Sequence, residues 1–410
     1  MSKLEELIEK LCPNGVEYKT IGEVANYRRG SFPQPYTNSS FYGGEDAMPF
    51  VQVADIEDNG FKLKEKTKQT ISKIAQPKSI FVPTGTVICS IQGTIGRVAV
   101  TQYDAYVDRT IAIFEGFKID INKRFFAYCI ELKFGIEKKF ARGSTLKTIT
   151  KEEFTKFCIP VPPLEVQCEI VHILDDFTLL SAELSAELKA RRQQFEFYRD
   201  KLLNFDDTVS RKKFGDIAII QRGASPRPIN QFITEDKNGV NWIKIGDVET
   251  GAKYITKCRE KITVEGSRKS RNVKKGDFIL SNSMSFGRPY ILAIDGCIHD
   301  GWLSISNFEN YFITDFLYYL LNTSDIQNEF KKKASFGGAV QNLNADIVRS
   351  IELPIPSKEK QKEIINILDR FDKLCNDISE GLPAEIEKRQ KQYEYYRDKL
   401  LTFKELKVEE

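Results

Sequence analysis

The stretches FEFYRDKLLNF at 195–205 and YEYYRDKLLTF at 393–403 contain the same hexapeptide, YRDKLL, 198 positions apart. Chance repetition of six residues in a chain of 410 is very rare, so the hexapeptide indicates an internal duplication. The segments that precede each copy support this interpretation. IPVPPLEVQCEIVHILDDF at 159–177 matches LPIPSKEKQKEIINILDRF at 353–371, at an offset of 194.

A similar offset relates the earlier segments of the two halves. The matched pairs are IGEVANYRRG (21–30) with FGDIAIIQRG (214–223), PFVQVADIED (49–58) with NWIKIGDVET (241–250), TGTVICSIQGTIGRV (84–98) with KGDFILSNSMSFGRP (275–289), and ARGSTLKTIT (141–150) with SFGGAVQNLN (335–344). Their order is collinear and the offset stays between 191 and 198. We therefore expect two copies of one unit, each a globular block followed by a helical arm.

Each arm is predicted to be a long helix. Apolar residues recur in steps of three and four from Val166 to Leu202, the pattern of a helix that packs on another helix. The second arm repeats this pattern, but Gly381 and Pro383 are expected to break or kink it. Such stripes are ordinarily core packing, and two similar arms in one chain can pack on each other. The first arm also carries a tandem tetrapeptide, SAELSAEL at 181–188.

Each block is predicted to be α+β. Short runs of β-branched and aromatic residues, such as TVICSI and PYILAI, lie between Gly, Pro and Asp turn signals, and a helical segment closes each block. The predicted domains are 1–162, an N-terminal helix with the first block; 163–205, the first arm; 206–356, the second block; and 357–410, the second arm and tail.

Composition indicates a globular protein of the cytoplasm. Apolar residues make up 41% of the chain, no apolar run approaches the roughly 18 residues that span a bilayer, and MSKLEELIEKL is no signal peptide. Eight scattered cysteines and two histidines predict neither a zinc site nor a disulfide framework. The net charge of +3 divides into +5 over 20–162, +3 over 206–356 and −3 over 163–205, a bias compatible with nucleic-acid binding by the blocks.

Motifs for catalysis are missing from the sequence. It contains no GxxxxGK[ST] phosphate loop, no GxGxxG turn, no GxSxG elbow and no asparagine-proline-proline-aromatic motif of an amino-methylating enzyme. The triplet EDK at 235–237 faintly resembles part of a nuclease motif, but a solvated loop explains it better. We expect no catalytic residue and no metal ligand in this chain.

Three polar loops occur once per block at matching places: 27–30 with 220–223, 90–97 with 281–288, and 138–148 with 331–342. Each loop taken singly is compatible with ordinary turn chemistry. Arginine reads guanine edges, Gln and Asn read adenine, and Lys holds phosphate, so these loops suggest two DNA sites that read different sequences. The lysine runs fit solvated helix ends equally well. The candidate DNA-binding residues are Arg28, Arg29, Gln92, Thr94, Arg97, Lys138, Lys139, Arg142, Ser144, Thr145, Lys147, Arg222, Asn282, Ser283, Ser285, Arg288, Lys331, Lys332, Lys333, Gln341 and Asn342.

Taken together, these segments resemble the DNA-specificity subunit of type I restriction–modification systems. The resemblance covers the whole chain. It is carried by LCPNGVEYKTIGEV at 11–24, by the PVPP and PIP entries with the EIVxILDxF and EIIxILDRF segments that follow them, and by both YRDKLL copies. SAELSAEL resembles the tetrapeptide repeat in the family's central helix. The recognition blocks vary within the family.

The resemblance implies two similar α/β recognition domains separated by two long antiparallel helices, with internal pseudo-two-fold symmetry. Each domain would dock in the major groove of one half of a split double-stranded DNA site, and the helices would set the spacer. Two modification subunits and two motor-nuclease restriction subunits would be the partners. S-adenosylmethionine, ATP and Mg²⁺ would belong to those partners and none to this chain, which would be a non-catalytic reader.

The hexapeptide itself suggests a docking face. Packing between the arms would tolerate many substitutions and does not explain an identical Arg-Asp-Lys, whereas two copies of one surface facing two copies of one partner would explain it. The candidate partner-binding residues are Tyr198, Arg199, Lys201, Tyr396, Arg397 and Lys399. The alternatives are a two-module scaffold on a coiled coil that binds a non-DNA ligand, and a self-sufficient DNA enzyme. The charge distribution argues against the first and the missing motifs against the second.

Overall fold

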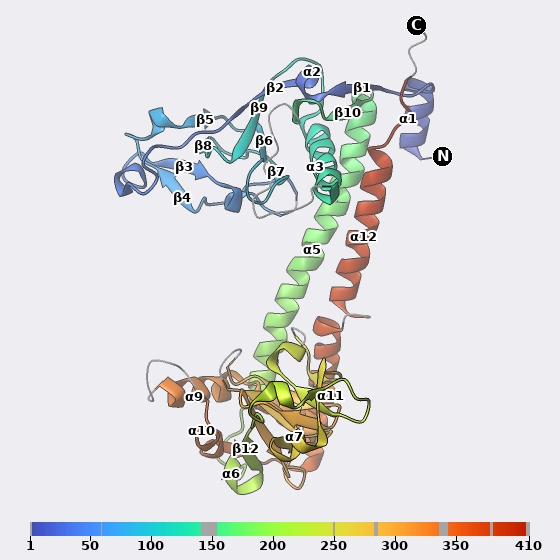
Figure 1. The fold of residues 1–410 in the computed structure, drawn as a ribbon. Coiled ribbons are helices and arrows are strands. Elements are labelled where there is room, and N and C mark those ends of the chain that lie inside the picture. The colour runs from blue at the N-terminus through green and yellow to red at the C-terminus, as the bar shows by residue number, and fades with distance from the viewer. Residues whose placement is uncertain are drawn as a thin grey trace. The chain divides into compact units, whose positions relative to one another are not determined.

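The computed structural model describes residues 2–58, 60–140, 154–248, 251–282, 286–335, 343–377 and 380–406. The chain forms two compact units, Met1–Ala186 with Glu385–Glu410, and Glu187–Ala384. Each unit contains one globular block together with parts of both arms. The long helix α5 (Leu164–Leu202), labelled in Figure 1, contributes 164–186 to the first unit and 187–202 to the second.

The first unit contains two four-stranded sheets. In one the strand order is β2 (Ala25–Arg29), β9 (Ile111–Phe117), β6 (Val87–Ser90), β7 (Val98–Val100), and in the other it is β4 (Gln69–Ile71), β3 (Met48–Val51), β8 (Ala105–Val107), β5 (Ile80–Val82). A two-stranded ladder joins β1 (Glu17–Thr20) to β10 (Cys158–Val161). The remaining elements are α1 (Lys3–Leu11), α2 (Ile21–Val24), η1 (Ser39–Phe41), η2 (Val53–Asp55), η3 (Gln76–Lys78), α3 (Lys123–Phe140) and α12 (Leu382–Leu400).

The second unit repeats these sheets and adds one edge strand to each. The strand order is β12 (Ile219–Arg222), β21 (Trp302–Ser306), β18 (Phe278–Ser281), β19 (Pro289–Leu292), β15 (Tyr254–Ile255) in one, and β13 (Ile233–Thr234), β16 (Glu260–Ile262), β14 (Val240–Ile243), β20 (Gly296–Ile298), β17 (Arg271–Val273) in the other. β11 (Arg211–Lys213) pairs with β22 (Glu352–Pro354). The other elements are α6 (Phe214–Ile217), η4 (Ile229–Gln231), η5 (Ile245–Asp247), α7 (Val264–Arg268), α8 (Thr314–Leu321), α9 (Ser324–Ser335), α10 (Ala345–Arg349) and α11 (Lys358–Asn376).

Strand direction is duplicated along with strand order. β3 runs parallel to β8 in the first unit, and β14 runs parallel to β20 in the second, whereas the neighbours of both pairs are antiparallel. Two matching sheets with the same mixed direction confirm the sequence prediction of a duplicated α+β unit. The closing helix is the main difference, because α3 is continuous whereas α8 and α9 are separate helices.

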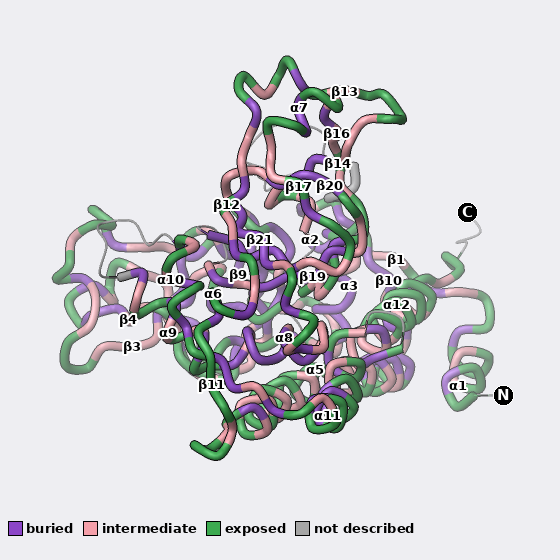
Figure 2. Tube along the Cα trace, turned by 90° about the horizontal axis from the view of Figure 1, so that it is seen from below, coloured by how far each residue is buried: buried purple, intermediate pink, exposed green. Residues whose placement is uncertain are grey.

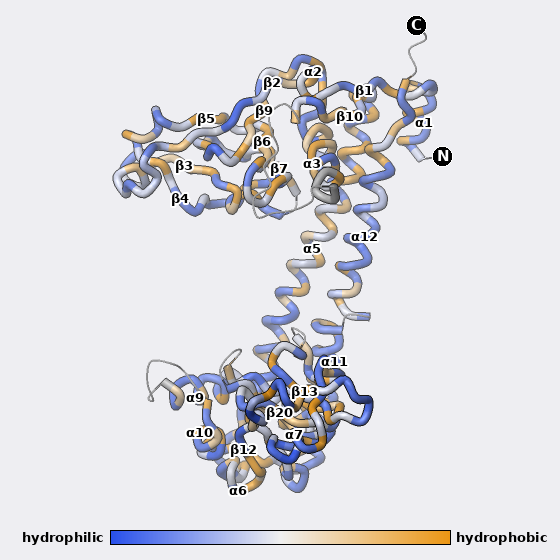
Figure 3. The backbone as a smooth tube through the Cα atoms, in the orientation of Figure 1, coloured by the Kyte–Doolittle hydropathy of each residue, from blue (hydrophilic) through white to orange (hydrophobic). Residues whose placement is uncertain are grey.

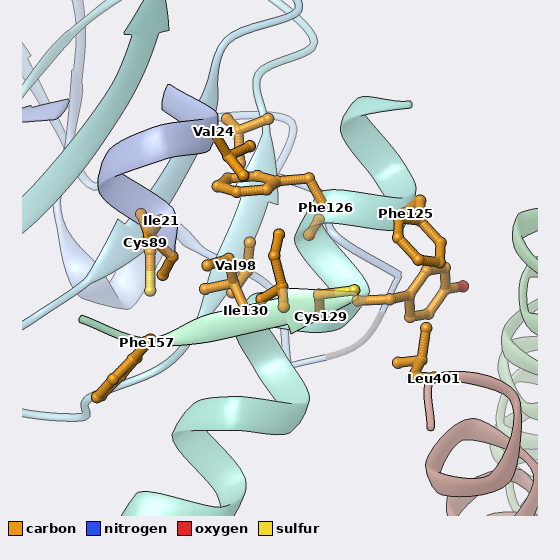
Figure 4. Packing of buried hydrophobic residues seen from close by; sticks show 14 of the residues in the cluster. Ile21, Val24, Cys89, Val98, Phe125, Phe126, Cys129, Ile130, Phe157 and Leu401 are labelled. Carbon is orange, nitrogen blue, oxygen red and sulfur yellow. The ribbon is translucent and has the colours of Figure 1, made fainter. Parts of the chain in front are cut away.

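Apolar runs in the central strands place the core between sheets and helices. In β6 and β18 all four residues are buried, as expected for central strands covered on both faces. Buried residues also gather along the neighbouring strands β9 and β21 (Figure 2). Phe125, Phe126 and Cys129 of α3 pack into the same cluster as residues of α2 and β7 (Figure 4). Leu401, which follows α12, points into this cluster, so the second arm contributes to the first unit's core.

The arms pack on each other through matching aromatic stacks, one in each unit. In the first unit the rings of Phe177 (α5) and Tyr396 (α12) stack with centroids 5.5 Å apart. In the second, Tyr198 (α5) and Phe371 (α11) stack at 5.8 Å. The paired helices run in opposite directions (Figure 1), as the resemblance implied, and α5 alternates hydrophilic and hydrophobic residues along its length (Figure 3).

The second arm is interrupted, as predicted, between Asn376 at the end of α11 and Leu382 at the start of α12. A Cβ at Gly381 would lie 2.6 Å from the carbonyl oxygens of both Lys373 and Asp377, so only glycine fits this turn. Pro383 does not break the helix, because it lies in the first turn of α12, where no intrahelical N–H is needed. Within the described residues, none of the helices is both long and apolar enough to cross a membrane.

Candidate nucleic-acid interface

A buried glutamine fixes each block to its own arm. Gln167 of α5 is 1% exposed, accepts a hydrogen bond from the backbone N–H of Asn122 at 2.8 Å and donates one to the Pro162 carbonyl at 2.7 Å. The matching Gln361 of α11 is fully buried and accepts from the N–H of Ile313 at 2.8 Å. Its amide also donates to the carbonyls of Tyr311 and Pro356, at 2.8 and 3.0 Å.

An aspartate about two helical turns after each of these glutamines makes a second matched contact. Tyr128 donates its hydroxyl to Asp175 at 2.7 Å, and Tyr319 donates to Asp369 at 2.5 Å. Burial and the neighbouring carboxylate raise the pKa of both tyrosines, so both remain hydroxyl donors at neutral pH. These two polar contacts set each block on its arm in the same way in both units.

The polar edge of each block lies where its two sheets meet, and we call this region the sheet junction. In the first unit it comprises residues 29–31, 52, 69, 90–94 and 108–110. Gly30 donates its N–H to Ile111, Ser31 to Val107, and Asp108 to Val51, which brings the ends of β2, β8 and β3 together. A Cβ at Gly30 would lie 2.3 Å from the carbonyl oxygen of Asp108, so this approach requires glycine.

The sheet junction of the second unit, residues 222–225, 244, 260, 281–282 and 299–301, has the same construction. Gly223 donates its N–H to Trp302 and Ala224 to Ile298. A Cβ at Gly223 would lie 2.0 Å from the His299 carbonyl oxygen. Arg29–Gly30 and Arg222–Gly223 therefore lie at equivalent strand ends at the junctions, since the two arginines are the last residues of β2 and β12.

Of the predicted DNA-binding residues in the first block, two lie on the exposed part of β2. Arg28 forms an ion pair with Glu115 at 3.0 Å, whereas Arg29 is exposed at the junction. Gln92 is half-buried and Thr94 is exposed. Both lie in the loop that follows β6, and β9 separates β6 from Arg29 on β2 in the sheet.

Arg97 ends that loop but turns away from the junction. Its guanidinium donates to the Ile56 carbonyl at 3.1 Å and pairs with Asp58, and it lines a cleft of about 310 Å³ together with Glu57, Glu131 and Arg397. The carboxylates of this cleft make it a poor site for phosphate.

In the second block the predicted residues are also divided. Arg222 is exposed, and its Nε donates to the Asp300 carbonyl at 3.2 Å. Asn282 is 4% exposed, and its amide donates to the same carbonyl at 2.8 Å, so it supports the junction from inside. Arg288 lies 5.6 Å from the Tyr290 ring. Lys333 bonds Glu329 at 2.8 Å, while Lys331 and Lys332 are exposed on α9.

The remaining predicted residues cannot be placed at the junction. Lys138 and Lys139 lie in the last turn of α3, and nothing is described of their side chains. The others lie outside the described residues: Arg142, Ser144, Thr145, Lys147, Ser283, Ser285, Gln341 and Asn342.

Sequence reasoning missed further polar groups at both junctions. Arg109 is exposed beside Arg29, with its guanidinium 4.6 Å from the centre of the Phe32 ring. The Arg227 side chain is 83% exposed and lies 3.8 Å from the carboxylate of Asp300, the residue whose carbonyl accepts from Arg222. Gln52 and Lys244, which were also missed, occupy matching positions after β3 and β14. The alignment of 49–58 with 241–250 already contained this signal, since Gln52 and Lys244 differ while the positions on either side of them are apolar in both segments.

The hexapeptide arginines lie against their own blocks. The Arg199 side chain is 12% exposed and pairs with Asp200 at 2.7 Å, and Asp200 also accepts the N–H of Ser324 at 3.2 Å. Arg397 is 18% exposed, pairs with Asp398 at 2.7 Å and lies 5.7 Å from the Tyr393 ring. Part of the identity of the two hexapeptides therefore has an explanation within the chain.

Other arm residues are open to a partner. Lys201 and Lys399 are exposed, whereas Tyr198 and Tyr396 are 37% and 36% exposed and stack across the arms. Phe197 and Tyr395, which precede the two hexapeptides, are 62% and 63% exposed. Two large aromatic side chains at equivalent, exposed positions form a feature that the sequence analysis did not single out.

Within the described residues, the structure contains no group of three or more His, Cys, Asp and Glu side chains that could hold a metal ion. The EDK triplet at 235–237 lies in an exposed turn after β13, in agreement with the solvated loop expected from the sequence.

Comparison with known proteins finds one family twice in the chain. The family described as "Type I restriction modification DNA specificity domain" matches residues 13–191 and again residues 207–388. A putative type I restriction enzyme specificity subunit of Haemophilus influenzae is 29% identical over 423 residues, which covers 98% of this chain and 100% of that protein. The specificity subunit of EcoR124I/EcoR124II from Escherichia coli is 33% identical over 300 residues, covering 69% of this chain and 72% of that subunit.

A solved structure has the same fold. It comes from work on complex assembly and conformational transition of the type I R-M system, and it matches with a TM-score of 0.68 at 14% identity, covering 95% of this chain and 98% of the other. The comparisons give no support to the alternative of a scaffold for a non-DNA ligand.

Proposed function

This chain belongs to the type I restriction–modification DNA-specificity family, and from that premise we propose that it reads a bipartite double-stranded DNA site, one half with each unit. One observation carries the proposal. The two sheet junctions have the same backbone construction and each exposes arginine, but their remaining polar side chains differ. Two junctions with the same backbone and different polar side chains are suited to recognising two different base sequences.

The exposed arginines suit the sequence-independent part of DNA binding. Arg29 and Arg109 in the first unit, and Arg222 and Arg227 in the second, lie beside the loops that would face a groove. Guanidinium groups at such positions contact phosphates, and release of counterions then makes affinity depend steeply on salt.

The chain would act with partner subunits and not as a catalyst. We propose that two modification subunits dock on the arms, where Lys201 and Phe197 in one unit match Lys399 and Tyr395 in the other. Two restriction subunits would complete the complex. S-adenosylmethionine, ATP and Mg²⁺ would then act in these partners, because this sequence contains no motif for any of them.

Affinity for duplex DNA at several salt concentrations, with and without a modification subunit, tests the proposal. We expect affinity to fall steeply with salt, with a slope reduced by about one for each phosphate-contacting arginine that is removed. Arg29→Ala and Arg222→Ala should therefore each lower the slope. The control is Arg191→Ala on α5, an arginine that pairs with Glu187 on the arm at 3.4 Å and should leave the slope unchanged.

A salt-independent affinity would contradict DNA reading by this chain. Methylation by the chain alone, without a partner, would contradict the proposal that it is a reader and not the catalyst.

A further inference from the structure

A buried aspartate builds the same short turn at both sheet junctions. In the first unit Asp55 is 1% exposed and accepts two backbone N–H groups at 2.8 Å, from Gln52 and from Lys68. The turn is the 3₁₀ helix η2, which follows β3 directly. Because both hydrogen bonds go to the backbone, they hold position 52 in place whichever side chain it carries.

The second unit has the same turn. The side chain of Asp247 is 1% exposed, and it accepts the N–H of Lys244 at 2.9 Å and that of Arg259 at 3.3 Å. Here the 3₁₀ helix is η5, which follows β14. Positions 52 and 244 are therefore structurally equivalent.

The neighbouring strands supply a second equivalent position. Gln69 lies opposite Phe50 in the pairing of β3 with β4, and Glu260 lies opposite Trp242 in the pairing of β14 with β16. Phe50 and Trp242 are themselves equivalent core residues, 0% and 2% exposed. Each junction thus holds one pair of side chains on a matched and rigid backbone.

The chemistry of the two pairs differs completely. In the first unit the Gln52 amide donates to the Gln69 carbonyl oxygen at 3.1 Å and also contacts the Tyr36 hydroxyl. In the second, the Lys244 ammonium and the Glu260 carboxylate form an ion pair. The Lys244 and Glu260 side chains are 37% and 34% exposed, and Gln52 and Gln69 are half-buried, so in both units the pair is accessible at one side.

These groups have the hydrogen-bonding capacity that base edges require. A glutamine amide can bond adenine at N6 and N7, lysine suits the O6 and N7 acceptors of guanine, and a carboxylate accepts from N4 of cytosine. A pair of side chains already bonded to one another is also preorganised, so that less rotamer freedom is lost on binding.

We infer that Gln52 with Gln69 in the first unit, and Lys244 with Glu260 in the second, are the specificity-determining pairs that read bases in their own half-sites. The inference rests on the proposed function and deepens it. The arginines at each junction would hold the duplex, and the pair would distinguish its sequence. The two half-sites would differ at the bases that the pairs face.

The test exchanges the pairs in the full-length chain, assembled with its modification subunit. Q52K/Q69E gives the first unit the second unit's pair, and K244Q/E260Q does the reverse. Base preference is measured by competitive methylation of a duplex library randomised in both half-sites. Each double variant should change preference about tenfold or more at one or more positions of one half-site only, and the two variants should affect different halves.

A matched control removes the charges of an ion pair that lies away from the junctions. Glu387 and Lys391 of α12 form an exposed pair at 2.6 Å, and E387Q/K391Q should leave both half-sites unchanged. The single variant Q52E keeps the shape of the side chain and replaces an amide donor by an acceptor, so it tests the inference even if a double variant folds poorly.

Two results are decisive. If the wild-type chain prefers certain bases and Q52E, Q52K/Q69E and K244Q/E260Q all keep those preferences, the inference is overturned while the proposed function stands. If the wild-type complex shows no base preference in either half, the proposed function fails and the inference fails with it.

Discussion

In the first unit Gln167 and Asp175 of α5 hold the block, and in the second Gln361 and Asp369 of α11 make the same contacts to matching partners. At the sheet junctions the backbone is equally well matched, yet an amide pair in one unit stands where an ion pair stands in the other. The buried polar contacts have been kept through the duplication and the exposed ones have diverged. Divergence of exposed polar side chains on a matched backbone is what separate recognition of two sequences requires.

The largest expected effect comes from the arms, which differ in that only the first carries SAELSAEL. Deleting Ser185–Leu188 shortens a helix by about 6 Å and rotates its continuation by roughly 40°. We expect the tolerated gap between half-sites to shorten by about two base pairs while both half-site sequences remain the same. Mapping of methylated sites measures both. Changed half-sites with an unchanged gap would show that the arm does not set the spacer.

Removal of a buried glutamine should cost the most stability. Gln361→Leu leaves the N–H of Ile313 and the carbonyl of Tyr311 without partners, which should lower the free energy of unfolding by about 3 kcal/mol. Gln167→Leu should cost about 2 kcal/mol, since it removes fewer hydrogen bonds. Urea denaturation followed by circular dichroism measures this. Gln390→Leu, an exposed control on α12, should have little effect, and equal small losses for all three would contradict the proposed framework.

The two aromatic stacks should contribute equally to the stability of their units. Tyr198→Ala and Tyr396→Ala should each destabilise their unit by about 1 to 2 kcal/mol, because both remove a half-exposed ring from a stacked pair. Phe197→Ala and Tyr395→Ala are the matched controls, since these rings are mostly exposed and should change stability little. The control variants should instead weaken co-purification of the modification subunit. Retention of normal binding in both controls would move the docking face elsewhere.

The smallest expected effect is a pH dependence of stability that the second unit has through His299. Burial lowers the pKa of His299 against the opposing effect of Asp300, and its Nδ1 accepts the N–H of Gly301 at 2.6 Å, which requires the neutral ring. Lys244 also lowers this pKa and Asp247 raises it. The folded state therefore binds fewer protons than the unfolded state near pH 6.5, and this contribution to stability is lost as pH falls through that value.

Tryptophan fluorescence can follow the second unit alone, because both tryptophans, Trp242 and Trp302, lie in it near His299. Between about pH 7.5 and 5.5, His299→Gln should flatten the fall in stability of that unit. His172→Gln, at an exposed position in the first unit, should change nothing. An identical pH dependence in wild type and His299→Gln would show that the ring does not titrate in this window.

The repeat was enough to predict most of the fold. Six identical residues and a collinear offset predicted two copies of a block and an arm, and short β-branched runs between turn signals predicted α+β blocks. The break near Gly381 followed from its residue type. The roles of Arg97 and Asn282 could not be predicted, because a polar residue in a loop looks the same whether it faces solvent or an internal carbonyl. The pairs at 52 with 69 and 244 with 260 join positions on different strands, which only the sheet register reveals.

Exchange of a whole block tests the central claim most directly. In a chain whose residues 213–356 are replaced by a second copy of 20–162, both sheet junctions would carry the first unit's side chains on the same arms. Methylated bases mapped genome-wide, in a host that supplies the modification subunit, should then show two half-sites of one sequence in place of the two unlike half-sites of the wild type. Two unlike half-sites that persist in the exchanged chain would contradict recognition of one half-site by each unit.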